Sequence, residues 1–299
     1  MSVLSDTDTD AWVPDFVIVG PQKCATTWMY EGLAEHPDVY VPDTDSVHYF
    51  DMGYHRGTEW YREHFPENPE PYSVIGEETP SYIRSEEVPE RLAALNPDAK
   101  VIFSLRNPVD RAFSHYWHEK SKGKLSFEFE EVFENYDLYE NWVRPGMYVD
   151  HIERFEDAFD PEQIKLMYFD DLVDDDEAFI REVYDFVGVD SSFTPTIIDE
   201  KVNDARWSSG VELVDKLYYR AVNIMYRRAD ESVKRYLRPV HEFVQDGGLS
   251  NPFESESEYE KGMDPETRRR LEEVFREKTK ELEDRTGRRF GHWFDHVDY

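Results

Sequence analysis

The sequence predicts an α/β fold in which helices flank a central parallel sheet, with further helices added towards the C-terminal end. Short apolar runs alternate with segments of helical periodicity up to about residue 190, and this alternation favours a parallel sheet covered on both faces. Hydrophobic residues make up 39% of the 299 residues, enough for a buried core. No internal repeat or linker separates a second domain, so we expect a single domain over residues 11–299.

Four short apolar runs are expected to form the strands of this sheet. They occupy residues 16–19, 74–76, 101–105 and 164–169, lengths that suit buried strands better than helices. Helical patterns are found at about 27–35, 86–95, 109–120, 148–159 and 177–187. The last of these ends at Gly188, a residue type that commonly terminates helices.

The two ends of the chain differ in character. Residues 1–10 are polar and acidic, and we expect a disordered tail there. Apolar spacing over 211–238 predicts helical structure, and the Gly, Ser and Glu content of 245–262 predicts a surface loop. Asp264 and Pro265 then supply an N-cap and a first-turn proline for a long helix to about Arg285.

The net charge of −32 is the most unusual global property of the sequence. Asp and Glu total 66 against 34 Lys and Arg, an excess that repels nucleic acid and anionic membranes. We therefore expect no nucleic-acid partner. The acidic surface suits a halophilic, high-salt cytoplasm where salt screens self-repulsion; an acidic face for a basic partner is the alternative. Any anion-binding site must be a local cluster of positive charge.

Location and partners are constrained only in outline. The single cysteine, Cys24, excludes an intrachain disulfide and a cysteine-built zinc site and suits a reducing compartment. No stretch approaches the ~18 apolar residues of a membrane span, and no secretory leader opens the sequence. These features predict a cytoplasmic protein, and they leave peripheral membrane association and the oligomeric state open.

A phosphate-binding turn is predicted directly after the first strand. Strand, tight turn and helix start follow one another there, which presents free backbone N–H groups and the positive helix end to an anion. Lys23 adds a charge, and Thr26 and Thr27 add hydroxyl donors. A Gly-Pro turn before a Thr-capped helix also occurs without any ligand, so the turn alone does not decide. The candidate ligand-binding residues are Gly20, Gln22, Lys23, Cys24, Ala25, Thr26, Thr27 and Trp28.

This turn departs from the nucleoside-triphosphate loop GxxxxGK[ST]. In an alignment on Gly20, Ala25 takes the place of the second glycine, Thr26 that of the lysine and Thr27 that of the Ser/Thr. The lysine has moved three places towards the strand, to Lys23. That position suits a donor with one 5′-phosphate whose bridging oxygen must be neutralised as it leaves.

The turn resembles the 5′-phosphosulfate loop of sulfotransferases that use 3′-phosphoadenylyl sulfate (PAPS), most closely that of heparan-sulfate-type and bacterial carbohydrate sulfotransferases. A second segment, KVIFSLRNPVDRAFSHY over residues 100–116, is similar to the strand and helix that bind the 3′-phosphate in that family. The resemblance assigns this contact to Arg106 and Ser114. An arginine can contact a phosphate through two N–H groups at once. The alternative for Arg106 is a surface ion pair.

Further segments extend the resemblance. Residues 77–82 (EETPSY), 146–159 and 282–293 are similar to family segments of the same order. The resemblance implies a P-loop-like three-layer domain and PAPS as co-substrate. It also implies a hydroxyl or amine acceptor that is a small molecule or glycan, with a carbohydrate favoured. We expect no metal, because Lys23 can stabilise the charge on the leaving phosphate.

The general base is where the sequence departs from the family. The family carries its catalytic glutamate in a segment that here reads DSVHYFD over residues 45–51, which places Ser46 at the glutamate position. Glu78 likewise replaces a lysine of heparan-type relatives. His48, whose ordinary pKa is near 6.5, is the favoured base, with Asp45 and Glu77 as alternatives. His48 as a group that only orients the acceptor, and an inactive nucleotide-binding homologue, remain open.

Two further expectations concern the nucleotide and a competing function. The family closes its donor pocket with a loop that we place at residues 201–210. Arg206 is the candidate contact there, and Trp207 suits the core as well as it suits a stacking platform. The competing function is a P-loop nucleotide or metabolite kinase using ATP and magnesium, with Asp170 as a metal ligand after the strand at 164–169. The third hypothesis is a non-enzymatic acidic interaction protein that retains the fold.

Overall fold

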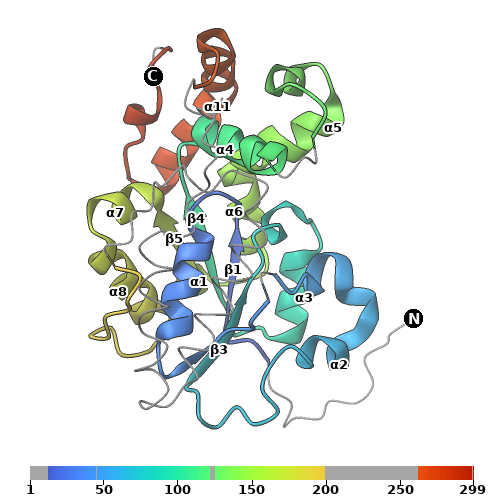
Figure 1. Cartoon of the computed structure of the whole chain (residues 1–299), viewed down its shortest axis with the longest axis vertical. Coiled ribbons are helices and arrows are strands. Elements are labelled where there is room, and N and C mark those ends of the chain that lie inside the picture. Colours follow the sequence, from blue (N-terminus) through green and yellow to red (C-terminus); the bar gives the residue numbers. More distant parts are fainter. Residues whose placement is uncertain (1–12, 45, 122–124, 199–261, 298) are drawn as a thin grey trace, which may run out of the picture.

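A computed structural model describes residues 13–44, 46–121, 125–198, 262–297 and 299. Its centre is a five-stranded sheet in the order β2-β3-β1-β4-β5, in which every neighbouring pair is parallel (Figure 1). The strands are β1 (Phe16–Gly20), β2 (Val39–Tyr40), β3 (Val74–Glu78), β4 (Lys100–Leu105) and β5 (Ile164–Tyr168).

Helices connect the strands and follow the last one. They are α1 (Thr26–Glu35), α2 (Gly57–Arg62), α3 (Val88–Leu95), α4 (Pro108–Ser121), α5 (Tyr136–Leu138), α6 (Tyr148–Glu156), α7 (Phe169–Asp174), α8 (Asp176–Val187) and α11 (Pro265–Thr286). Two short elements matter for the site: the π-helical turn η1 (Tyr49–Gly53) and the 3₁₀ turn η3 (Tyr82–Arg84).

The side chains of the sheet alternate between two buried layers, as a strand period of two requires. On one face Phe16, Ile18 and Ile102 pack with apolar residues of α1 and α8, which lie side by side in Figure 1. On the other face Val17 and Val101 pack with residues of α3, α4, α6 and α11. Helices therefore cover both faces, and the predicted three-layer architecture with a central parallel sheet is confirmed.

Most predicted elements are present, with small shifts at their ends. Phe169 begins α7 rather than ending β5, and the helix expected over 148–159 ends at Glu156. Strand β2 was not predicted. Asp264 caps α11 by accepting a hydrogen bond from the Thr267 N–H at 3.0 Å, and Gly188, with a φ of 96°, ends α8. The predictions for 1–10, 211–238 and 245–261 lie outside the described residues.

The strand order places a change of direction beside β1. The connection that leaves β1 leads to β2 on one side of the sheet, whereas the one that leaves β4 leads to β5 on the other side. Open α/β sheets bind ligands at the carboxyl ends of the strands where this change occurs. The predicted phosphate turn after β1 and Arg106 after β4 both lie at that point. Within the described ranges, no helix is both long and apolar enough to cross a membrane.

Candidate donor and acceptor site

The turn after β1 has a tightly constrained backbone. Gly20 has a φ of 108° and joins Pro21 through a cis peptide bond, and Lys23 and Ala25 also have positive φ values of 70° and 63°. A β-carbon on Gly20 would overlap the backbone of Pro80, coming within 2.8 Å of its Cα. Glycine is needed here because the turn packs directly on the segment that follows β3.

The amino end of α1 is left open towards this turn. Ala25 occupies the N-cap position, makes no side-chain capping bond, and is followed by no acidic residue in the first turn. The first amides of a helix need acceptors from outside the helix, so this end favours an anion. Thr26 is buried and Thr27 is exposed, so their hydroxyls lie in different surroundings.

Cys24, Gln22 and Trp28, which were also predicted to bind the ligand, lie against the protein interior. The Ser104 hydroxyl of β4 donates to the Cys24 carbonyl. Burial raises the pKa of the Cys24 thiol to about 11, which keeps it a packed, protonated group. The buried Gln22 Oε1 and Trp28 Nε1 find no hydrogen-bond partner among the described residues, and the Trp28 ring packs edge-on against Phe179.

Arg106, predicted to contact the 3′-phosphate, lies against the predicted phosphate turn. Its guanidinium lies over the Phe169 ring, 4.4 Å from the ring centre, and its Nη1 donates to the Lys23 carbonyl at 3.2 Å. The Arg106 carbonyl accepts from the Tyr148 hydroxyl at 2.7 Å. The lysine turn and the arginine therefore share one site. Ser114 lies in the middle of α4, where its side chain is partly exposed.

His48 belongs to a three-residue polar cluster. Its Nδ1 lies 3.1 Å from Asp51 Oδ2 and 3.2 Å from the Ser81 hydroxyl, which itself donates to Asp51 Oδ2 at 2.8 Å. The His48 side chain is 37% exposed and that of Asp51 12%. Burial alone would raise the pKa of Asp51, but hydrogen bonds from His48, the Met52 amide and Ser81 hold it below its ordinary value. An ionised Asp51 binds the Nδ1 proton of His48 and leaves Nε2 available as an acceptor.

This cluster is close to the phosphate turn. Ser81 follows Pro80, the residue against which Gly20 packs, and the Thr79 N–H donates to the Ile18 carbonyl of β1 at 3.0 Å. The predicted phosphate turn, Arg106 and His48 are thus joined through neighbouring segments at the carboxyl ends of the strands.

Glu77, an alternative base, occupies different surroundings. Its side chain is fully buried at the end of β3 and accepts hydrogen bonds from the hydroxyls of Tyr61, Thr79 and Tyr82. Burial raises the pKa of Glu77 to about 7. Because the Glu77 carboxylate has no exposed surface, it cannot take a proton directly from a sulfuryl acceptor in this conformation. Asp45 and Arg206 lie outside the described residues.

Several residues of the site were given no role from the sequence, although three of them belong to the segment 77–82 noted above. They are Asp51, Ser81, Tyr61, Thr79 and Tyr82. Asp51 follows His48 by three residues, a separation that brings side chains together in a helical turn, and this spacing could have indicated the pair. The contacts with Tyr61 and Glu77 join segments that only the fold brings together.

Asp170, the candidate metal ligand of the competing kinase hypothesis, has hydrogen-bond partners within the protein. Asp170 Oδ2 accepts from Trp293 Nε1 at 2.9 Å and contacts His292 Nε2 at 3.0 Å. Because Asp170 follows β5, these contacts connect the C-terminal segment to the sheet. In the described part of the chain, no three His, Cys, Asp or Glu side chains gather as metal ligands would.

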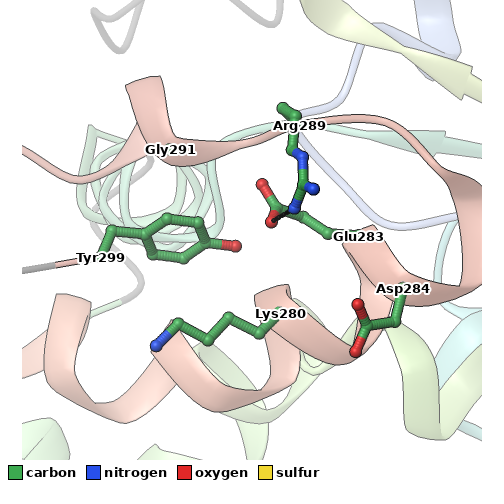
Figure 2. A pocket seen from close by; sticks show the side chains of 6 residues that line it. All are labelled: Lys280, Glu283, Asp284, Arg289, Gly291 and Tyr299. Atoms are coloured by element: carbon green, nitrogen blue, oxygen red, sulfur yellow. Dashed lines mark hydrogen bonds and ion pairs between the residues drawn. The ribbon is translucent and has the colours of Figure 1, made fainter.

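A separate hollow lies on the C-terminal segment (Figure 2). It has a volume of about 460 Å³ and is lined by Lys280, Glu283, Asp284, Arg289, Gly291 and Tyr299. Arg289 is paired with Glu283 at 3.0 Å, and acids and bases are mixed across the lining, so its chemistry indicates no ligand class. None of the residues of the donor site lines it.

Comparison with known proteins agrees with the geometry of this site. The family model described as "Sulfotransferase domain" matches residues 13–283. The chain is 36% identical over 198 residues to human bifunctional heparan sulfate N-deacetylase/N-sulfotransferase 3, and 34% identical over 183 residues to mouse heparan sulfate glucosamine 3-O-sulfotransferase 3A1. Each match covers 59% of this chain, but 22% and 46% of those relatives.

A solved structure shows the same relationship. The crystal structure of a sulfotransferase from Alicyclobacillus acidocaldarius matches with a TM-score of 0.57 and 26% identity, over 75% of this chain and all of that one. The fold is accordingly the P-loop-like fold of sulfotransferases. Because the family model spans the sheet, the donor turn and Arg106 together, the chain belongs to the sulfotransferase domain family.

Proposed function

We propose that this protein transfers the sulfuryl group of PAPS to a hydroxyl or amine of a carbohydrate acceptor. The observation that carries the proposal is the hydrogen bond from Arg106 to the Lys23 carbonyl. It supports the proposal because a nucleotide with a 3′-phosphate and a 5′-phosphosulfate would need the arginine and the lysine turn to be neighbours. The similarity to two heparan sulfate sulfotransferases supports a saccharide acceptor.

The donor is expected to lie across the carboxyl ends of β1 and β4. The amides of the turn and of the first turn of α1 bind its 5′-phosphosulfate, with Gly20, Lys23, Thr26 and Thr27 nearest the anion. Arg106 and Ser114 bind its 3′-phosphate. Lys23 stabilises the negative charge that develops on the bridging oxygen as the sulfur–oxygen bond breaks.

His48 is the proposed general base. The acceptor oxygen or nitrogen attacks sulfur, the bond from sulfur to the 5′-phosphate oxygen breaks, and the acceptor proton passes to His48 Nε2. Adenosine 3′,5′-bisphosphate leaves with both electrons of the broken bond. Asp51 holds the imidazole through Nδ1, and its negative charge stabilises the imidazolium that forms. This arrangement supplies a base although Ser46 occupies the position of the family's glutamate.

The setting of the reaction is part of the proposal. The excess of acidic residues and the single cysteine support a salt-rich, reducing cytoplasm. A cytoplasmic enzyme would act on a free or carrier-linked sugar precursor. Comparing activity in low and high concentrations of potassium chloride tests the salt requirement.

Two measurements test the proposal. Labelled PAPS should transfer its sulfuryl group to at least one member of a panel of saccharides with free hydroxyls or amines. Calorimetry should detect binding of adenosine 3′,5′-bisphosphate without metal, and weaker binding of ATP with magnesium. Selective binding of ATP with magnesium would overturn the proposal in favour of a kinase.

A further inference from the structure

One buried carboxylate lies beneath the segment that carries His48. Glu77 accepts hydrogen bonds from Tyr61 Oη at 2.7 Å, Thr79 Oγ1 at 2.8 Å and Tyr82 Oη at 3.2 Å. Each hydroxyl has a single proton to give, so an ionised Glu77 fixes the direction in which all three protons point. The oxygen lone pairs of the Thr79 and Tyr82 hydroxyls then point away from Glu77.

Those lone pairs accept four consecutive backbone amides. The N–H groups of Val47 and His48 donate to Thr79 Oγ1 at 3.2 and 3.5 Å. The N–H groups of Tyr49 and Phe50 donate to Tyr82 Oη at 2.8 and 3.2 Å. Two hydroxyls thus hold the entire stretch 47–50, and both depend on the same carboxylate for their orientation.

The stretch needs such support because its backbone is unfavourable. His48 has a φ of 56°, in the left-handed region that is disfavoured for a residue other than glycine. Such conformations persist only where the surroundings impose them. The four amide contacts hold the N–H side of this stretch, while the Gly53 N–H and Arg91 Nη1 donate to the carbonyls of His48 and Phe50, each at 2.7 Å. In this conformation the His48 side chain lies beside Asp51 and Ser81.

We propose that Glu77 is a positioning residue, whose carboxylate orients the Thr79 and Tyr82 hydroxyls so that they hold residues 47–50 and aim His48. The role of His48 as a base rests on the proposed function; the effect of Glu77 on the 47–50 backbone does not. This assignment differs from a direct proton-accepting role for Glu77.

The ionisation of the cluster is consistent with this role. Burial raises the pKa of Tyr61 and Tyr82 well above its ordinary value, as does the nearby charge of Glu77, so both remain protonated donors. Burial also raises the pKa of Glu77 to about 7, with a smaller contribution of the same sign from Asp51 of η1 and an opposing one from the three hydroxyls. The paired strand β1 places only apolar Val17 opposite Glu77.

Tyr82→Phe and Thr79→Val test the proposal, with Tyr61→Phe as the matched comparison. All three lose one hydroxyl bonded to Glu77, but only Tyr82 and Thr79 also bind amides of 47–50. Hydrogen exchange should accelerate about tenfold or more at residues 49 and 50 in Tyr82→Phe, and at 47 and 48 in Thr79→Val. Tyr61→Phe should change exchange at these positions by less than about threefold.

Catalysis supplies the second readout. In Tyr82→Phe, Thr79→Val and Glu77→Gln, kcat should fall about tenfold or more, while the Kd for adenosine 3′,5′-bisphosphate stays within about twofold. Thr79→Ser keeps the hydroxyl and should restore both exchange and kcat. Glu272→Gln removes another fully buried carboxylate, one that contacts His296 in the C-terminal segment, and should leave kcat unchanged.

The outcomes separate the inference from the proposed function. If exchange at 47–50 and kcat are unchanged in both Tyr82→Phe and Thr79→Val, the positioning role is overturned. If exchange accelerates as expected but the wild-type protein transfers no sulfuryl group, the positioning role stands and the proposed function fails. Loss of donor affinity in parallel with kcat would also overturn the inference, because it would indicate general damage to the site.

Discussion

Single side chains decide how this site can act, and His48 shows this most clearly. Its imidazole is about one-third exposed and bonded to a mostly buried Asp51, which is the geometry of a base held by a carboxylate. Glu77, only a few residues from Ser81 in the sequence, has no exposed surface. The sequence offers both as candidate bases, and their environments separate them.

The charge of Lys23 is the first property to test. Lys23→Ala should lower kcat by about 100- to 1000-fold, because one well-placed group at a developing oxyanion contributes about 2.7–4 kcal/mol. Single-turnover assays with labelled donor measure this. Lys165→Ala, which removes a lysine paired with Glu182 on the surface, is the matched control. Turnover like that of the wild type in the Lys23 variant would refute the assignment.

The pair of His48 and Asp51 gives a second prediction. His48→Gln should lower kcat about 100-fold or more, the usual contribution of a general base, with unchanged affinity for the bisphosphate. Asp51→Asn should lower kcat as well, because the neutral amide neither stabilises an imidazolium nor fixes the Nδ1 proton. Both are read from steady-state kinetics and calorimetry. A kcat that survives in His48→Gln would place the base elsewhere.

Ionisation of Glu77 should lower the stability of the folded protein. Its pKa is about 7 in the folded protein and 4.5 for an ordinary glutamate, so the folded state binds the proton more tightly. Its contribution to stability is therefore fully present below about pH 4.5 and is lost as pH rises through 7, a change of about 3 kcal/mol. Urea unfolding from pH 5 to 8 should show this slope, and Glu77→Gln should flatten it. An identical slope in the variant would contradict the assignment.

At the scale of elements, the site depends on close contacts between segments that follow different strands. The turn after β1 packs against Pro80 so closely that Gly20 admits no β-carbon. Arg106 after β4 donates to that same turn. The phosphate turn is therefore not an independent loop, and its shape depends on the segments after β3 and β4.

Gly20→Ala tests this dependence. The added methyl overlaps the Pro80 backbone at a φ of 108°, and backbone cannot move aside as a flexible side chain can. We expect a loss of roughly 2–4 kcal/mol in the free energy of unfolding, together with weaker binding of adenosine 3′,5′-bisphosphate. Gly57→Ala is the control, because Gly57 also has a positive φ of 85° but open space around its Cα. Equal effects of the two variants would show that φ alone is responsible.

Prediction from the sequence succeeded where local pattern determines structure. β1 and β4 are buried strands of five and six residues, which read as apolar runs because both faces of the sheet are covered. β5, at the edge of the sheet, has five residues that are mostly half-buried, and its run of apolar residues was still recognisable. β2 has only two residues, too few to leave a pattern. The network around Glu77 could not be predicted, because Tyr61 and Tyr82 meet it from separate elements. The donor site stays a prediction, and it rests on the similarity of the two phosphate segments to a family, because local periodicity alone would not have indicated it.

The whole molecule has a charge that should govern its response to salt. A net charge of −32 repels itself over the Debye length, which is about 10 Å at 0.1 M salt and about 3 Å at 1 M. The free energy of unfolding, measured with urea, should therefore rise as potassium chloride is increased from 0.1 to 2 M. Stability that stays constant or falls over this range would show that the acidic residues are already neutralised by their neighbours.

The hydrogen bond between Arg106 and the Lys23 carbonyl also affects how donor analogues bind. Under the proposed function, Arg106 binds the 3′-phosphate and hydrogen-bonds to the turn that binds the 5′-phosphosulfate. The two ends of the nucleotide should then be recognised cooperatively, and their contributions to affinity should not be additive. Adenosine 5′-phosphosulfate, which lacks the 3′-phosphate, should therefore bind more weakly than the loss of the 3′-phosphate contacts alone would explain. Discrimination between PAPS and adenosine 5′-phosphosulfate would then depend on the backbone of the turn as well as on the Arg106 side chain.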